Sequence, residues 1–171
     1  MLIDHTPLYN EVWERVEREL GFRPGVVRMH DFSGQLPFDL PGAYAVYGIE
    51  DMTVEQLDLL EELARGIFAE AAGVGERVYA LDWHHSAFLY DPRNLEEQQS
   101  FFVEDQRYMG GGYFAYFPSF YPDGDYYFFI DEQFRFGYLG HPWRREVWIF
   151  GEALLPRFEQ VHQRMGWRRL R

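Results

Sequence analysis

The stretch PDGDYYFFIDEQFRFGYLGHPWRREVWIFGEALL, residues 122–155, decides the fold of this chain. It opens with the turn signal Pro122-Asp123-Gly124, and an apolar strand then runs from Asp125 to Ile130. A strand that is apolar on both faces is typical of the centre of a sheet. Residues 134–139 alternate in the pattern of a half-exposed strand, and Val147–Phe150 follows as the next one. We therefore expect an antiparallel, meander-like sheet in this half of the chain.

Three helices are expected to pack with this sheet. The first has Thr6 as its N-cap and ends at Gly21. The second begins at Thr53, where Gln56 completes a capping box, and the third ends at Gly166. Further strands are predicted over residues 26–30, 43–49, 78–84 and 88–90. No linker divides the chain, so we expect a single α+β domain over residues 1–171.

Residues 95–117 give the weakest pattern of the chain. They contain an acidic, helix-like piece whose carboxylates are expected on a solvated face, followed by the run Gly110–Gly112 between aromatic residues. Successive backbone N–H groups can bind phosphate, but no Lys, Ser or Thr follows the glycines here. The sequence favours a plain loop at this point.

The composition excludes several classes of function. The chain carries 28 acidic and 16 basic residues, a formal net charge of −12, which argues against nucleic-acid and anionic-membrane binding. It has no Cys and no Lys, which excludes thiolate and Schiff-base chemistry and the lysine of a phosphate-binding loop. The N-terminal residues lack a signal-peptide pattern, and no apolar run is long enough to span a membrane. A cytoplasmic protein without a cofactor is expected.

The motifs of the second half resemble a known family. The order ALDW (residues 80–83), DGDYY (123–127), FRFG (134–137), GHPW (140–143) and FGE.LL (150–155) is similar to that of a bacterial family catalogued as domain of unknown function twenty-seven sixteen. The resemblance covers the second half well and the first half weakly, and the chain departs from it between Asp91 and Tyr121. It implies a fold neighbourhood and no particular reaction.

Asp82, His84 and His141 are the candidate catalytic residues. On a strand Asp82 and His84 share one face, and a carboxylate beside an imidazole can orient a general base or hold a metal. A metal needs further ligands, and His141 is the attractive candidate. The spacings typical of metal sites are missing, so the sequence predicts no metal site, and a hydrogen-bonded pair at a sheet edge is the simpler interpretation.

Four further residues are candidates for ligand binding. Trp83 and Trp143 can line an apolar pocket, with a rigid turn at 140–143 as the alternative for Trp143. Arg135 and Asp125 lie on neighbouring strands of a hairpin, where a cross-strand ion pair is the simple account. Alternatively, the Arg135 guanidinium can anchor an anionic ligand.

Three functional hypotheses follow. The leading one is a non-catalytic protein-binding module, such as an immunity-type antagonist of a basic protein, which uses the acidic second helix and the aromatic segment 108–121 as its contact surface. The alternatives are a small-molecule-binding domain and a hydrolase-like enzyme built on the Asp/His residues. The sequence leaves the oligomeric state open.

Overall fold

The structure, a computed structural model of the chain, describes residues 1–24 and 35–171. The helices are α1 (Pro7–Leu20), α2 (Val54–Ala71) and α3 (Leu155–Met165), with a short 3-10 helix, η1 (Leu95–Glu97). The strands are β1 (Tyr44–Gly48), β2 (Val78–Asp82), β3 (Ala87–Tyr90), β4 (Phe101–Glu104), β5 (Gly112–Ala115), β6 (Tyr127–Asp131), β7 (Gly137–His141), β8 (Glu146–Phe150) and β9 (Arg168–Arg169). The predicted α+β class with an antiparallel sheet is confirmed. The strand predicted over residues 26–30 lies outside the described residues.

Seven of these strands form one antiparallel sheet in the order β3-β2-β6-β7-β8-β1-β9. The strands β6, β7 and β8 are the predicted meander, and β6 lies inside the sheet between β2 and β7, as its apolar sequence indicated. In the register of β2 and β6, Val78 lies opposite Asp131 and Asp82 lies opposite Tyr127. This pairing places the end of β2 beside the start of β6, where the candidate site is found.

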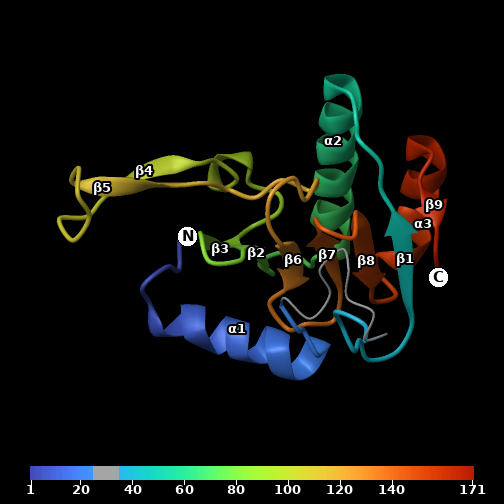
Figure 1. Cartoon of the computed structure of the whole chain (residues 1–171), viewed down its shortest axis with the longest axis horizontal. Coiled ribbons are helices and arrows are strands. Elements are labelled where there is room, and N and C mark those ends of the chain that lie inside the picture. The colour runs from blue at the N-terminus through green and yellow to red at the C-terminus, as the bar shows by residue number, and fades with distance from the viewer. Residues whose placement is uncertain (25–34) are drawn as a thin grey trace.

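The helices cover both faces of the sheet, with α1 on one face and α2 and α3 on the other (Figure 1). In β2, Tyr79 and Leu81 pack on the α1 face, whereas Val78 and Ala80 pack on the α2 face. Alternation along the strand therefore directs Asp82 to the α2 face. In β7, by the same rule, His141 follows Leu139 on the α1 face.

Strands β4 and β5 form a separate hairpin, which extends away from the body of the molecule (Figure 1), and residues 101–116 are called the arm below. The helix-like prediction for this region was wrong beyond η1, because Glu104 is the last residue of β4 and Asp105 lies in the turn of the arm. The glycine run completes that turn, and Gly110 and Gly111 both have positive φ angles. The run is thus a hairpin loop, in agreement with the favoured interpretation.

Two predicted strands end differently in the structure. The strand beginning at Val78 stops at Asp82, because the chain turns at Trp83–Ser86, where His84 has a φ of 68°. The alternation after Ile130 does not mark a half-exposed strand, because Phe134 and Arg135 belong to a turn and every residue of β7 is buried. A strand that is buried on both faces needs no alternation, so the alternating pattern over residues 134–139 was misleading.

The first residues of the chain lie along β3, the edge strand of the large sheet. Ile3 donates its N–H to the carbonyl of Ala87 at 2.8 Å, and Leu2 forms a bridge with Phe88. This segment covers backbone groups that an edge strand would otherwise expose. Among the described residues, none of the helices combines the length and apolar character required to cross a membrane.

Candidate functional site

The turn between β2 and β3 brings His85, and not His84, to the carboxylate of Asp82. His85 Nδ1 and Asp82 Oδ1 form a hydrogen bond with a length of 2.9 Å. The backbone fixes this arrangement, since Asp82 N–H donates to the carbonyl of Ser86 at 2.8 Å and His85 N–H donates to the carbonyl of Asp82 at 3.1 Å. The predicted pairing of Asp82 with His84 on an extended strand was therefore wrong, because the strand ends at Asp82.

Asp125 completes a group of three ionisable side chains. It lies just before β6, and its Oδ2 atom is 3.6 Å from His85 Nδ1. One ligand atom from each of Asp82, His85 and Asp125 falls within 4.8 Å of the other two. We call these residues the Asp/His cluster. Asp82 is 5 % exposed, whereas His85 lies at the surface, so the cluster spans the boundary between core and solvent.

Burial is the main influence on the two carboxyl groups of the Asp/His cluster. It raises the pKa of Asp82 to about 6, and the nearby Asp125 carboxylate adds to this effect, while the His85 hydrogen bond opposes it. Burial also raises the pKa of Asp125. The hydrogen bond to Asp82 raises the pKa of His85. A buried carboxyl group and an imidazole in hydrogen-bond contact, each with a raised pKa, are suited to acid–base chemistry or to metal binding.

His141 does not join the Asp/His cluster, because it lies on the opposite face of the sheet. Its ring is fully buried and meets the ring of Tyr126 edge to face at 4.8 Å. Trp83 and Trp143 contact the same tyrosine, at 5.3 Å and 4.9 Å between ring centroids. Three predicted site residues thus gather around Tyr126, which the sequence analysis did not single out. The structure does not bring together Asp82, His84 and His141, whose convergence the enzyme hypothesis requires.

Asp125 precedes β6 and Arg135 follows it, so the two residues lie beyond opposite ends of this strand. The Arg135 Nε donates to Asp131 Oδ2 at 2.7 Å, and its Nη2 donates to Glu76 Oε2 at 2.6 Å. The expected Asp125–Arg135 ion pair was wrong, because Asp131, the last residue of β6, provides a carboxylate closer to Arg135. The Nε and Nη2 groups of the guanidinium are already engaged by these two carboxylates, so the geometry gives no support to an anion-anchoring role for Arg135.

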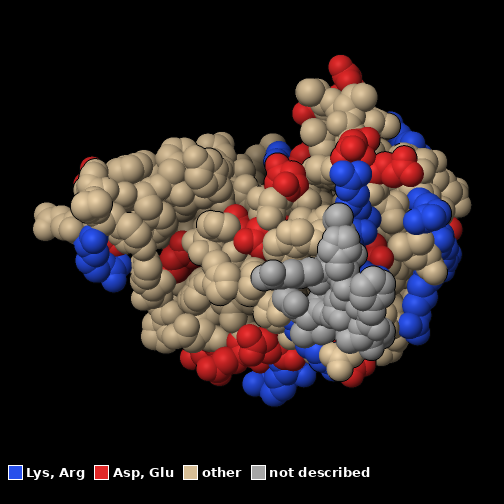
Figure 2. Space-filling view, in the orientation of Figure 1, with Lys and Arg blue, Asp and Glu red and all other residues tan. Residues whose placement is uncertain are grey.

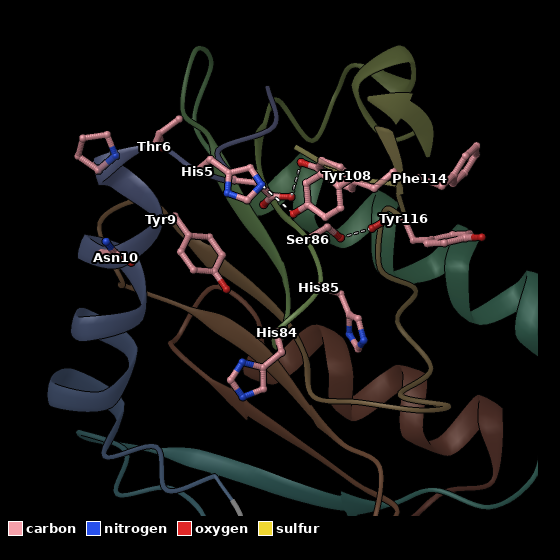
Figure 3. Close-up of a pocket in the computed structure, with 13 residues that line it drawn as sticks. His5, Thr6, Tyr9, Asn10, His84, His85, Ser86, Tyr108, Phe114 and Tyr116 are labelled. Atoms are coloured by element: carbon pink, nitrogen blue, oxygen red, sulfur yellow. Dashed lines mark hydrogen bonds between the residues drawn. The ribbon is translucent and has the colours of Figure 1, made fainter. Parts of the chain in front are cut away.

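A pocket of about 880 Å³ lies where the arm, the start of α1 and the β2–β3 turn meet (Figure 3). In this view the Tyr9 ring extends from α1 toward the cavity, and His84 and His85 lie across from it. The lining residues are Asp4, His5, Thr6, Pro7, Tyr9, Asn10, His84, His85, Ser86, Tyr108, Tyr113, Phe114 and Tyr116. Through His85, the pocket borders directly on the Asp/His cluster.

The polar groups of the pocket include one carboxylate, from Asp4, among four tyrosines and three histidines. The Asp4 carboxylate accepts a hydrogen bond from the Ala87 N–H at 2.7 Å and another from the Tyr113 hydroxyl at 3.3 Å. Burial raises the pKa of Asp4 and raises that of Tyr113 to about 12. No arginine occurs among the lining residues in the part of the chain that the structure describes. The pocket is therefore largely aromatic, and its tyrosine rings around Asp4 offer a cationic group both π faces and a carboxylate.

The arm presents several aromatic side chains to solvent, and three of them form a row on one of its faces. Phe102 and Phe114 lie opposite each other in the register of β4 and β5, and Tyr116 continues the same row. These three rings are 53 %, 46 % and 62 % exposed. Figure 2 shows that the visible surface of the arm is mostly uncharged. A row of exposed aromatic rings on a projecting hairpin is typical of an interaction surface.

The sequence did not reveal the residues that connect the arm to the body. Asp4 and Tyr113 are 109 positions apart, and no spacing rule relates them. The half-buried ring of Tyr9 lines the pocket, although its helical spacing from Val16 also fits the buried face of α1. The sequence contained one indication of this region, the tyrosines that flank the glycine run, from which a contact surface was predicted at residues 108–121.

Comparison with known proteins gives two matches. A family model described as "Protein of unknown function (DUF2716)" matches residues 5–155, which confirms the resemblance read from the motifs and extends it over the first half. The chain is similar to "Uncharacterized protein YxiI" of Bacillus subtilis (strain 168), with 28 % identity over 150 residues, 85 % of this chain and 84 % of that protein. No solved structure matches the chain.

Proposed function

The chain belongs to the DUF2716 family of proteins of unknown function, and we propose that it is a non-catalytic binding module that recognises a basic protein through the arm and the adjoining pocket. The observation that carries this proposal is the exposed row of Phe102, Phe114 and Tyr116 beside a pocket that contains Asp4. Aromatic rings provide contact area at low entropic cost, and a carboxylate among tyrosines binds an Arg or Lys side chain.

The overall charge supports a basic partner. A net charge of −12 steers oppositely charged proteins toward the molecule and repels acidic ones. An immunity-type antagonist, which covers a basic surface of its target, is the kind of binding protein that this combination fits. The acidic face of α2, with Glu55, Asp58 and Glu62 in its sequence, is proposed as a second contact region.

Affinity capture with matched baits tests the proposal. The full chain, the arm variant Phe102→Ser/Tyr116→Ser and the control variant Val74→Ser/Leu170→Ser are immobilised and exposed to lysate of the source organism. The control removes exposed apolar side chains of similar kind that lie outside the arm, since Val74 is 95 % and Leu170 is 42 % exposed. We expect a basic protein that the wild type and the control retain, that the arm variant loses, and that salt elutes.

Two results would contradict this proposal. Capture of the same proteins by all three baits would show that the arm is not the contact surface. Retention of acidic proteins, or retention that rises with salt, would exclude a basic partner held by charge.

A further inference from the structure

We propose that the Asp/His cluster, residues Asp82, His85 and Asp125, is a binding site for a divalent transition-metal ion. The proposal is independent of the protein-binding function. Carboxylate oxygen and imidazole nitrogen bind such ions at about 2.0–2.2 Å, which brings ligand atoms of one ion within about 4.4 Å of each other. The ligand atoms of the cluster, at 2.9 Å, 3.6 Å and all within 4.8 Å, need only small side-chain rotations to reach this geometry.

Backbone contacts hold two of the three ligands in place. The Tyr126 N–H donates to Asp125 Oδ1 at 2.7 Å, which turns Oδ2 toward His85. Asp82 is held at the end of β2 by the ladder with β6 and by the hydrogen bond from its N–H to Ser86. A site whose ligands are fixed before binding loses little conformational entropy when the ion enters.

The local charge favours a cation. Asp82 and Asp125 are close to each other, and the Asp123 carboxylate adds to the negative potential at Asp82. Within the part of the chain that the structure describes, His85 is the only residue that forms an ion pair with these carboxylates, and His84 adds an electrostatic attraction at Asp125. A divalent ion would take the place of the proton on His85 Nδ1 and neutralise both carboxylates.

The ligand set points to a transition metal and not to Ca²⁺ or Mg²⁺. Ca²⁺ takes six to eight oxygen ligands, and Mg²⁺ keeps most of its waters, whereas one imidazole with two carboxylates suits Zn²⁺, Co²⁺, Mn²⁺ or Fe²⁺. Three protein ligands leave at least one coordination position for water or another ligand. Because His85 also lines the pocket, the ion would lie at the edge of that pocket.

The two carboxylates belong to the motifs by which this chain resembles its family. Asp82 is the acidic residue of ALDW, and Asp125 is the second acidic residue of DGDYY. These motifs are more than 40 positions apart in the sequence, and the pairing of β2 with β6 brings them together. A shared metal site gives both motifs one chemical role.

Isothermal titration of the EDTA-treated, dialysed full chain with Zn²⁺ and with Co²⁺ tests the proposal, and the visible absorption of Co²⁺ reports its ligand geometry. We expect one equivalent of ion to bind. His85→Gln and Asp125→Asn should each weaken binding at least about tenfold, since each removes a direct ligand. His85 is largely exposed, so its variant should fold, and circular dichroism of each variant verifies this.

Asp123→Asn is the matched control, because it removes a nearby carboxylate that binds the Tyr127 hydroxyl and that is not a ligand of the cluster. It should leave the stoichiometry unchanged and the affinity within about twofold. The proposal fails if neither ion binds, if His85→Gln keeps the full affinity, or if Asp123→Asn weakens binding as much as Asp125→Asn does. The last result would show diffuse attraction of cations in place of a site.

Discussion

Tyr113 of the arm donates a hydrogen bond from its hydroxyl to the carboxylate of Asp4, 3.3 Å away, and so joins the arm to the start of the chain. The same carboxylate accepts from the N–H of Ala87 at 2.7 Å. A single side chain therefore connects three segments, namely the N-terminal residues, the edge strand β3 and the arm. The orientation of the arm and the shape of the pocket depend on this junction.

Removal of the Asp4 carboxylate should lower the free energy of unfolding more than removal of the Tyr113 hydroxyl does. Asp4→Ala leaves the N–H of the buried Ala87 without its acceptor, and we expect a loss of about 1–3 kcal/mol in the free energy of unfolding, measured with urea. Tyr113→Phe should cost no more than about 1 kcal/mol, because the Ala87 contact remains. It should still increase hydrogen exchange in β5. Equal losses of stability in the two variants would contradict a role for Asp4 beyond the Tyr113 contact.

Gly151 should not accept a side chain. Its φ is 90°, and a Cβ atom would lie 2.5 Å from the carbonyl oxygen of Arg135 and 2.5 Å from Cβ of Phe136. We expect Gly151→Ala to lower the free energy of unfolding by roughly 2–5 kcal/mol through strain and overlap. The control is Gly124→Ala, where no atom lies within 4 Å of the added group, and it should change stability by less than about 0.5 kcal/mol. A small effect at Gly151 would show that the junction after β8 adjusts easily.

Arg135 should contribute to stability through Asp131. The Asp131 side chain is only 1 % exposed, and it accepts from the Arg135 guanidinium at 2.7 Å and 2.8 Å. Arg135→Met leaves this carboxylate buried without its cation, and we expect a loss of about 1–3 kcal/mol. Glu76→Gln, which removes the charge of the less buried partner of the same arginine, should have a smaller effect on the urea midpoint. A larger loss of stability in Glu76→Gln than in Arg135→Met would show that the stabilising contact of Arg135 is the one with Glu76.

Local patterns in the sequence predicted the helices well. The capping box at Thr53 and Gln56 is present, with both hydrogen bonds formed. Gly21 and Gly166 end their helices in the left-handed conformation. These signals act over three or four residues, so tertiary contacts rarely override them. Thr6 is an exception, since it stands at the N-cap but its hydroxyl donates to the carbonyl of Ile3.

The candidate site was less predictable, because backbone turns and long-range pairing create it. Asp82 and Asp125 were identified, but the partner assigned to each was wrong. The positive φ of His84 reverses the chain, which exchanges the roles of His84 and His85. No spacing rule foretells such a turn in a stretch that also fits an extended strand. The pocket depends on contacts such as Asp4 with Tyr113, which only the folded chain reveals.

His141 should make the protein less stable as the pH falls. Its ring is fully buried, and this burial lowers its pKa to about 3. Between about pH 6.5 and 3 the unfolded chain therefore binds a proton that the folded protein does not. The contribution of His141 to the free energy of unfolding is thus fully present above about pH 6.5 and is lost progressively below that pH. Between about pH 7.5 and 5 this group should remove about 2 kcal/mol.

The wild-type protein alone does not isolate this effect, because Asp82 and other buried carboxyl groups with raised pKa values act in the opposite direction. A comparison of the wild type with His141→Gln isolates the contribution of His141, because the variant lacks only the imidazole. The stability of the variant relative to the wild type should increase by about 2 kcal/mol between about pH 7.5 and 5 in urea titrations. In the folded wild type the NMR signals of the imidazole should stay those of the neutral form down to about pH 4. A constant difference between the two proteins, or a titration midpoint near 6.5, would show that the ring is accessible to protons in the native state.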